Sequence, residues 1–317
     1  MEEGGSADAA PAVQRRRLEL TVEVPTGSGL GALRQAVLGW GEANRRDLPW
    51  RATRDPWHVL VSEVMLQQTQ VSRVLGPYRR FIERFSTPAA CAAARVADVV
   101  VAWEGLGYNR RAVYLHRTAG VLVERHGGRV PVDLTALVSL PGVGAYTARA
   151  VLSFAFEVDT GVVDTNVARL LSRAVAGHPL GAVSSQKLAD SLVPAGRAWA
   201  FNQSLFDIGA RHCVARHPDC HGCPLRRRCR WAAAGWPPPD PAAASAGTAR
   251  PQSRFAGSDR EGRGRLVTAL RRRSIAATEL ARASGWAGEP ERARQIADEL
   301  VRDGLARWGS AGLLELA

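Results

Sequence analysis

The sequence predicts an all-α protein that carries a small winged-helix-like module near its C-terminus, and three observations support this. Apolar residues recur at helical spacing through most of the chain between Gly31 and about Trp236, without convincing strand alternation. A stretch rich in Pro, Ala, Gly and Ser then interrupts the pattern. Three short helical segments and one hairpin follow it.

These patterns divide the 317 residues into four parts. Residues 1–28 are small, polar and basic, and we expect them to be a disordered tail. Residues 29–235 form the helical core, and 236–258 form a linker rather than a packed element. Residues 259–317 form the winged-helix-like module, whose hairpin turns at Gly309–Gly312. In the core, the expected helical segments are 31–44, 56–85, 91–103, 110–127, 145–156, 164–177 and 201–213.

Charge favours a polyanionic partner, and nucleic acid before membrane. The formal net charge is +12, and Arg226 to Arg273 contributes twelve arginines against three carboxylates. A solvated tail is the alternative interpretation of that segment, and a helical appendage that enters no groove is the alternative for the module. The sequence shows neither an apolar run of about eighteen residues nor a secretory signal, so we expect a cytoplasmic, nucleoid-associated protein.

Glu63 lies in an apolar helical segment with no basic residue one helical turn away. The residues three and four positions from it are Val59, Leu60, Leu66 and Gln67. Desolvation raises the pKa of a carboxyl group that is buried without a cationic partner, so such a group can hold and donate a proton near neutral pH. A buried acid that is hydrogen-bonded to backbone or to a distant Arg is the alternative.

Two further features follow Glu63 along the chain. In "LPGVGAYTARA", Gly142 and Gly144 separate two helical stretches, and a helix that opens at Gly144 or Ala145 directs unpaired N–H groups outward, which suits a phosphate oxygen. Asp164 directly precedes a helical run, and the start of that helix is expected to keep its carboxylate ionised. A helix–turn–helix corner and an ordinary N-cap are the respective alternatives.

Four of the five cysteines are compressed into seventeen residues, with the spacing C-x6-C-x2-C-x5-C. Close thiolates in a cytosolic chain indicate a metal site rather than disulfides. Structural zinc usually uses two short knuckles, whereas a single x2 pair with longer intervals suits a loop around an iron–sulfur cubane. The spacing therefore favours a 4Fe-4S cluster over zinc, with Cys213, Cys220, Cys223 and Cys229 as the ligands.

The segment from about Gly41 to Arg230 resembles the helix-hairpin-helix DNA glycosylases with an iron–sulfur loop. The motifs "SEVMLQQTQV", "GLGY", "LPGVGAYTA" and "VVDTNVARL" and the cysteine spacing are similar to those of the adenine glycosylase branch, MutY type. The resemblance implies two helical subdomains, with DNA bound across the cleft and one base flipped into it. It implies base excision repair by hydrolysis of the N-glycosidic bond of adenine opposite 8-oxoguanine or guanine in double-stranded DNA, by a monomeric enzyme.

The resemblance also implies roles for individual residues. Glu63 is expected to protonate the leaving adenine, and Asp164 to stabilise the oxocarbenium-like sugar. Asn166 is expected to orient the catalytic water. The remaining expected contacts, with the substrate base or with the duplex, come from Trp50, Arg51, Gln67, Gln68, Thr69, Tyr108, Gly142, Gly144 and Asp207.

One position of the hairpin bears on the type of glycosylase. Related enzymes that also nick the strand carry a Lys two residues after the last Gly of the hairpin, where this chain has Tyr146, and the only Lys of the chain is Lys187. A lyase that uses a hairpin lysine is thereby excluded, and a monofunctional enzyme that uses water is expected.

Two other functions compete with adenine excision. A thymine or uracil mismatch glycosylase shares the scaffold and the Tyr, but "QQTQ" favours adenine. A non-catalytic DNA-binding regulator is the alternative from another class. The domain resembling nucleotide pyrophosphohydrolases that recognises 8-oxoguanine in longer family members has no counterpart here, which leaves the preference for 8-oxoguanine over guanine open.

Overall fold

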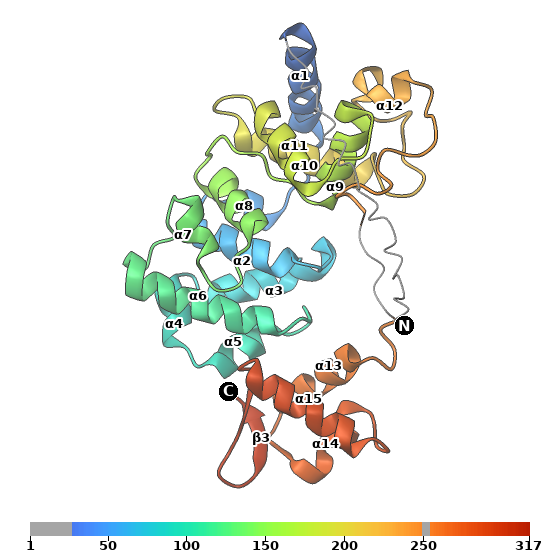
Figure 1. The fold of residues 1–317 in the computed structure, drawn as a ribbon. Coiled ribbons are helices and arrows are strands. Elements are labelled where there is room, and N and C mark those ends of the chain that lie inside the picture. Colours follow the sequence, from blue (N-terminus) through green and yellow to red (C-terminus); the bar gives the residue numbers. More distant parts are fainter. Residues whose placement is uncertain (1–26, 249–253) are drawn as a thin grey trace, which may run out of the picture.

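The chain folds into two helical subdomains and a smaller C-terminal module in a computed structural model that describes residues 27–248 and 254–317 (Figure 1). The predicted tail, residues 1–28, lies outside the described residues except where α1 (Gly27–Asn44) begins. No helix in the described part of the chain is long and apolar enough to cross a membrane.

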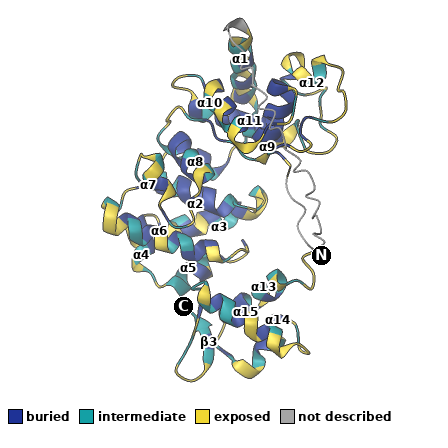
Figure 2. Ribbon diagram, in the orientation of Figure 1, coloured by how far each residue is buried: buried dark blue, intermediate teal, exposed yellow. Residues whose placement is uncertain are grey.

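The first subdomain lies in the middle of the molecule and surrounds a buried core that includes Trp103, Phe81 and Leu60 (Figure 2). Its core continues into the C-terminal module. Its elements are η1 (Pro49–Arg51), α2 (Pro56–Leu66), α3 (Val71–Arg84), α4 (Pro88–Ala93), α5 (Val96–Ala102), α6 (Arg110–His126), α7 (Leu134–Val138) and α8 (Ala145–Ala155).

The second subdomain combines α1 with a much later part of the chain, because α1 packs against α11 around a separate core that contains Val37 and Phe201. One of its turns is a π-helix, η2, which ends at Gly177 in the left-handed region. Its remaining elements are α9 (Thr165–Leu170), η2 (Leu171–Ala176), α10 (Ala182–Leu192), α11 (Ala198–Arg211), η3 (Arg226–Arg228) and α12 (Arg230–Ala233).

Helix α2 is shorter than the continuous pattern over 56–85 predicts. Its start is fixed by Asp55, whose carboxylate accepts from two backbone N–H groups. Its end is fixed by Arg111, whose guanidinium binds the carbonyls of Val64, Met65 and Gln67. Since the last carbonyls of a helix need external partners, this distant cation ends α2 and opens a loop before α3. The segment 91–103 also divides, into α4 and α5.

The C-terminal module has the three predicted helices and the predicted hairpin. Strands β2 (Ala306–Trp308) and β3 (Leu313–Leu316) pair antiparallel, and β1 (Ile275–Ala276) completes a sheet of order β1-β3-β2. Its helices are α13 (Asp259–Leu270), η4 (Ala277–Glu279), α14 (Leu280–Ser284) and α15 (Pro290–Arg302). The module docks on the first subdomain, where Arg271 donates to the Val100 carbonyl and the Asn109 side chain.

Part of the stretch predicted to be a linker is packed on the second subdomain. Ala242 and Ser245 are buried, and the Ala246 N–H donates to the Leu180 carbonyl over 2.8 Å. A Cβ atom at Gly247 would lie 2.6 Å from the Cβ of Arg169, so only glycine fits there. Small residues, which suggest a flexible linker, are also what a close backbone contact needs.

Candidate active site

A cavity of about 1190 Å³ opens between the two subdomains. Glu63 enters it from α2 of the first subdomain, and Asp164 enters it from the start of α9 of the second. The structure therefore brings together residues that lie about a hundred positions apart in the chain. The predicted site residues that line this cavity are Trp50, Arg51, Glu63, Gln67, Gln68, Thr69, Tyr146, Asp164 and Asn166.

Glu63 is a buried acid, 5% exposed, with little polar compensation. Burial raises its pKa to about 7, and the negative charge of Asp164 adds to that shift. A hydrogen bond with Tyr146 and the charge of Arg51 oppose the shift. Oε2 of Glu63 has no hydrogen-bond partner among the described residues. The group can therefore carry a proton close to neutral pH.

Asp164 caps α9, as predicted, but the cap does not lower its pKa overall. Its Oδ1 accepts from the Val167 N–H over 2.7 Å, and its Oδ2 accepts from Nδ2 of Asn166 over 2.8 Å. These bonds lower the pKa, and so does the charge of Arg169. Desolvation is the larger effect and raises the pKa above its ordinary value. The helix start therefore favours the ionised form of Asp164, as expected, but it acts against a larger effect of burial.

Asn166 holds Asp164 in place through both ends of its amide. Its Nδ2 donates to Asp164, and its Oδ1 accepts from Nη2 of Arg169 over 2.7 Å. Nε of Arg169 donates to the Cys213 carbonyl over 2.6 Å. A chain of hydrogen bonds thus runs from Asp164 to the loop that carries the cysteines. In this arrangement the Asn166 amide holds the Asp164 carboxylate, and the water-orienting role that the resemblance implies for Asn166 stays a prediction.

Asp207 does not reach the cavity. It is fully buried, and its two carboxylate oxygens accept from Arg51 over 2.8 and 3.0 Å and from Arg46 over 2.6 and 2.9 Å. These cations hold the pKa of Asp207 below its usual range, against the effect of burial. Four bonds occupy its acceptor positions, so the structure leaves none for a base edge and instead gives Asp207 the task of orienting Arg51.

Trp50 is 6% exposed and contacts the Tyr78 ring edge-on, with ring centroids 5.3 Å apart. The Trp50 side chain therefore belongs both to the wall of the cavity and to the buried core.

A second cavity, of about 1000 Å³, adjoins the first, because Gln67 and Gln68 line both. Tyr108, with 42% of its surface exposed, and Gly142 line it from the first subdomain. The C-terminal module closes it with residues of α13 and α15. Gln67 to Thr69 lie in the loop after α2, whereas the sequence predicted them on the same helix as Glu63.

The hairpin before α8 uses its two glycines differently. Gly142 has φ +75°, and a Cβ atom there would lie 2.8 Å from the Cβ of Tyr114, so both backbone conformation and space require glycine. Gly144 is the N-cap of α8, as predicted, and has open space around it. The free first turn of α8 remains suited to an anion.

The four clustered cysteines line one small cavity beside η2 and α12. Burial raises the pKa of the Cys223 thiol to about 11, and the neighbouring thiols of Cys213, Cys229 and Cys220 add to the shift. Within the described residues, no three Cys, His, Asp or Glu side chains are grouped as for a single metal ion. Four thiols that line a common cavity are residues that could hold a metal centre.

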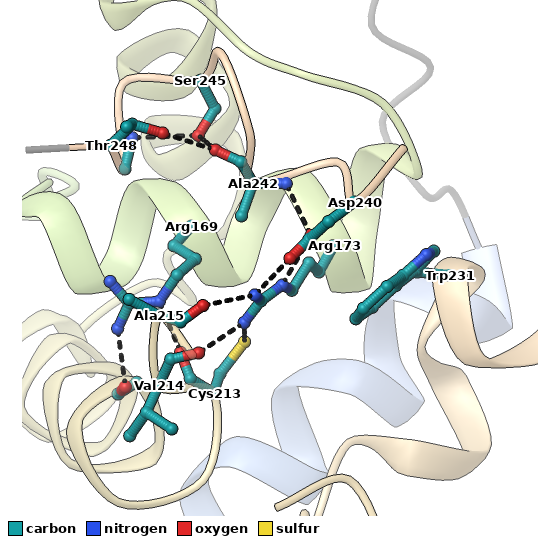
Figure 3. A network of polar contacts seen from close by, with 12 residues as sticks. Arg169, Arg173, Cys213, Val214, Ala215, Trp231, Asp240, Ala242, Ser245 and Thr248 are labelled. Carbon is teal, nitrogen blue, oxygen red and sulfur yellow. Dashed lines mark hydrogen bonds and ion pairs between the residues drawn. The ribbon is translucent and has the colours of Figure 1, made fainter. Parts of the chain in front are cut away.

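Arg173 fastens this loop to the segment that follows it, as Figure 3 shows. It is 2% exposed, and its guanidinium donates to the Asp240 carboxylate, to the carbonyls of Val214 and Ala215, and to Sγ of Cys213 over 3.6 Å. The same side chain therefore holds the cysteine loop and the packed segment 240–247 against η2.

Comparison with known proteins assigns the family. Residues 61–193 match the HhH-GPD superfamily of base excision DNA repair proteins. An adenine DNA glycosylase of Mycolicibacterium smegmatis is 43% identical over 286 residues, which cover 89% of this chain and 94% of the relative. One of Mycobacterium tuberculosis is 42% identical over 275 residues, which cover 85% of this chain and 88% of the relative. The chain belongs to the adenine DNA glycosylase family.

Other relatives of this family differ in how much of the chain they match. The human adenine DNA glycosylase is 41% identical over 213 residues, which cover 63% of this chain and 39% of the human protein. The match to M. smegmatis covers more of the chain than residues 1–258 contain, so it extends into the C-terminal module.

Two solved structures share the fold of the helical core of this chain. A thermostable thymine-DNA glycosylase superposes with a TM-score of 0.61 and 30% identity, over 65% of this chain and 97% of that structure. A trapped endonuclease III–DNA covalent intermediate, at 24% identity and a TM-score of 0.55, supports the fold.

Sequence reasoning missed several buried arginines that organise the site, above all Arg111, Arg169 and Arg173. The abundance of arginine conceals them, although Arg169 follows Asn166 at i+3 and so shares its helix face. It also missed that Lys187, exposed on α10, lines the cavity of Glu63 and Asp164.

Proposed function

We propose that the chain hydrolyses the N-glycosidic bond of adenine mispaired with 8-oxoguanine or guanine in double-stranded DNA. The observation that carries the proposal is the presence of Glu63 and Asp164 in one cavity, where each comes from a different subdomain. Their charges interact, because Asp164 raises the pKa of Glu63. Two coupled carboxyl groups around one substrate suit an acid-assisted cleavage that passes through a cationic sugar.

Glu63 acts as the general acid. Neutral adenine is a poor leaving group until a ring nitrogen is protonated, and a carboxyl group with a pKa of about 7 can donate that proton at neutral pH. Proton transfer of this kind contributes a factor of about 100 to 10,000 in rate. Tyr146 shares a hydrogen bond with Glu63 and thereby orients the carboxyl group.

Asp164 stabilises the oxocarbenium-like sugar, either through its charge or by transient bonding to the anomeric carbon. Its two oxygens already accept bonds from Val167 and Asn166, so the carboxylate is held in one orientation before the substrate arrives. While Glu63 keeps its proton, the pair carries a single negative charge, which lets Asp164 remain ionised beside Glu63. Water then attacks the sugar from the open cavity.

Base extrusion belongs to the second cavity. Gln68 and Tyr108 line it, and both are suited to occupy the place that the adenine leaves and to contact the opposite base. Trp50 and Arg51 form the wall of the first cavity, with Arg51 oriented by Asp207. Gly142, Gly144 and the first turn of α8 receive the phosphates of the same strand.

The enzyme is monofunctional, because Tyr146 occupies the position from which a hairpin lysine would attack the sugar. Lys187 is the one amine to consider, since it lines the same cavity. Treating a reaction mixture with borohydride, which reduces a Schiff base to a stable adduct, decides the matter. We expect no protein–DNA adduct, and an adduct that Lys187→Arg removes would contradict monofunctional hydrolysis.

A mismatch panel tests the substrate. Adenine release is expected from duplexes with adenine opposite 8-oxoguanine or guanine, and no release from thymine opposite guanine. The structural likeness to a thymine-DNA glycosylase makes the last duplex the necessary comparison. Turnover of the thymine duplex alone would contradict the proposal, and duplex binding without any base release would favour a non-catalytic regulator.

Cys213, Cys220, Cys223 and Cys229 hold a 4Fe-4S cluster in this proposal. The fit is chemical: four thiols around one cavity, and a cationic Arg173 in contact with one of them. The cluster would fasten the cysteine loop, whose Cys213 carbonyl accepts from Arg169, and Arg169 and Asn166 on α9 orient Asp164. Purified protein is expected to be brown, with an absorbance band near about 400 nm. A colourless protein that contains zinc would contradict the cluster.

A further inference from the structure

Arg111 joins two loops that are far apart in the sequence. We call residues 67–70, after α2, the glutamine loop, and residues 105–109, before α6, the tyrosine loop. Arg111 is 8% exposed. Its guanidinium binds backbone carbonyls of both loops and of the last turn of α2, and one hydroxyl of the glutamine loop. The acceptors are the carbonyls of Val64, Met65, Gln67, Leu106, Gly107 and Tyr108 and the hydroxyl of Thr69, at 2.6 to 3.4 Å.

The partners of Arg111 distinguish it from an ordinary structural ion pair. None of the seven acceptors is a carboxylate, so its charge is compensated by the dipoles of these groups and by the rings of Trp103 and Tyr108, whose centroids lie 5.4 and 5.7 Å from its Cζ. Burial lowers its pKa to about 10, and it stays protonated at neutral pH. An apolar residue would fill the same space without the free-energy cost of burying a charge. What a guanidinium adds is five donors in a rigid fork, which lysine does not offer.

Both loops present a residue in an unfavourable backbone conformation. Gln68 has φ 55° and Tyr108 has φ 45°, in the left-handed region that side chains other than glycine rarely adopt. Such conformations persist when the surroundings over-determine them. Arg111 binds the carbonyl before Gln68 and the carbonyls of Gly107 and Tyr108, so it constrains both positions directly.

The two constrained side chains face one space. Gln68 and Tyr108 line the second cavity, together with Gly142 of the hairpin. The tyrosine loop has further anchors in Arg73, which donates to the Gly105 carbonyl, and Arg271, which donates to Asn109. The link between the two loops, by contrast, is the fork of Arg111, supported by the contact of the Thr69 hydroxyl with the Leu106 carbonyl at 3.5 Å.

We propose that Arg111 is a positioning residue for base extrusion: it fixes the glutamine loop relative to the tyrosine loop, so that Gln68 and Tyr108 enter the duplex as one unit. This inference rests on the proposed glycosylase function and deepens it. The residue touches neither the reacting base nor Glu63 and Asp164. Its effect is therefore expected on extrusion of the base, and not on cleavage of the glycosidic bond once the base is in the cavity.

The test separates extrusion from chemistry with two substrates. One duplex holds adenine opposite 8-oxoguanine, and the other holds adenine in an already open site, opposite an abasic gap. For Arg111→Lys, which keeps the charge but loses the fork, we expect single-turnover adenine release to fall about tenfold or more on the first duplex and less than about threefold on the second. Arg111→Met is expected to show the same selectivity with a larger loss.

Arg125→Met is the matched control, because Arg125 is an exposed arginine in the last turn of the same helix. It removes the same charge from α6 and should leave both substrates within about twofold of the unchanged protein. Equal loss on both substrates with the Arg111 variants would overturn the proposal in favour of a general structural role. Unchanged release on both would overturn it too. The melting temperature of each variant identifies one that fails to fold, and Arg111→Lys is the variant expected to fold.

A fluorescence measurement keeps this inference distinct from the proposed function. 2-Aminopurine in place of the adenine brightens when it leaves the stack, whether or not any bond is cleaved. Extrusion that is lost in Arg111→Lys and kept in Arg125→Met supports the inference even if the unchanged protein releases no adenine. If the unchanged protein releases adenine but both variants extrude 2-aminopurine equally, the proposed function stands and the inference fails.

Discussion

Glu63 and Asp164 line one cavity, but the two subdomains treat their carboxyl groups differently. Glu63 sits on a helix with apolar neighbours, and one of its oxygens has no partner among the described residues. Asp164 accepts from a helix N-terminus and from Asn166, and a chain of polar groups continues behind it to the cysteine loop. Burial raises both pKa values, yet only Asp164 has several hydrogen bonds that oppose the shift.

The difference assigns the roles. A carboxyl group with few donors around it is more stable when it keeps its proton, whereas one surrounded by donors is more stable as the anion. The isolated carboxyl group of Glu63 on the first subdomain is thus suited to act as an acid. The hydrogen-bonded carboxylate of Asp164 on the second is suited to stabilise a positive charge. The two carboxyl groups, with these opposite environments, line the same cavity.

Removing the proton donor is expected to have the largest effect. Glu63→Gln keeps the shape and cannot protonate adenine, so single-turnover release should fall by about 100-fold to 10,000-fold while binding of the mismatched duplex is retained. Glu124→Gln, at an exposed position on α6, is the control and should change release less than about twofold. Unchanged turnover of Glu63→Gln would remove Glu63 from the mechanism.

Asp164→Asn tests the other side of the comparison with the fold preserved, because Asn is as good an N-cap as Asp. The variant keeps the start of α9 and loses the charge that stabilises the sugar cation. Release is expected to fall by about 100-fold to 1,000-fold, with the melting temperature unchanged within about 2 °C. A large loss of melting temperature with activity retained would make Asp164 a cap and nothing more.

The pH profile tests the protonation state of Glu63 directly. The acid works when protonated, and its pKa is about 7, so the rate of release should halve near that pH and then fall about tenfold for each further pH unit. Asp164 must be ionised, so the rate should also fall at low pH, on the side where its raised pKa lies. A rate that stays flat between pH 6 and about 9 would contradict a catalytic proton on Glu63.

Asn166→Ala weakens the hydrogen bonding that favours the anion of Asp164. Loss of this donor raises the pKa of Asp164 further, so a smaller fraction is ionised at a given low pH. We expect the acid limb of the profile to move to higher pH, so that release falls more at the acid end of the profile than at neutral pH. A uniform loss at every pH would indicate a role in substrate placement instead.

The sequence could predict those features that depend on residues close together in the chain. The environment of Glu63 depends on residues within one turn of its own helix, and the cap of α9 depends on Asp164 and its next three residues. Both are readable from local order, and the cavity that they share follows from the resemblance to known glycosylases.

The features that the sequence did not reveal are set by partners far along the chain. Helix α2 ends where it does because of Arg111, 44 residues after Gln67, and Asp207 is taken out of the cavity by Arg51, 156 residues before it. The small residues of 240–247 pack closely against Arg169 instead of forming a free linker. Nothing near these positions in the sequence marks the distant partner, least of all one arginine among many.

The smallest and sharpest change is Tyr146→Phe, which alters the pKa of Glu63 without removing either carboxyl group. The Tyr146 hydrogen bond lowers the pKa of Glu63, and its removal should raise that pKa, so the acid stays protonated to higher pH. The alkaline limb is expected to move up by a fraction of a pH unit, which makes the ratio of the rate at pH 8.5 to the rate at pH 6 up to about threefold larger in the variant than in the unchanged protein. At pH 6, where Glu63 is protonated in both proteins, the difference in rate measures the loss of the hydrogen bond that orients its carboxyl group. An alkaline limb that moves to lower pH would mean that Tyr146 stabilises the protonated form of Glu63. The apolar surroundings of Glu63 on its helix would then not be what keeps it protonated.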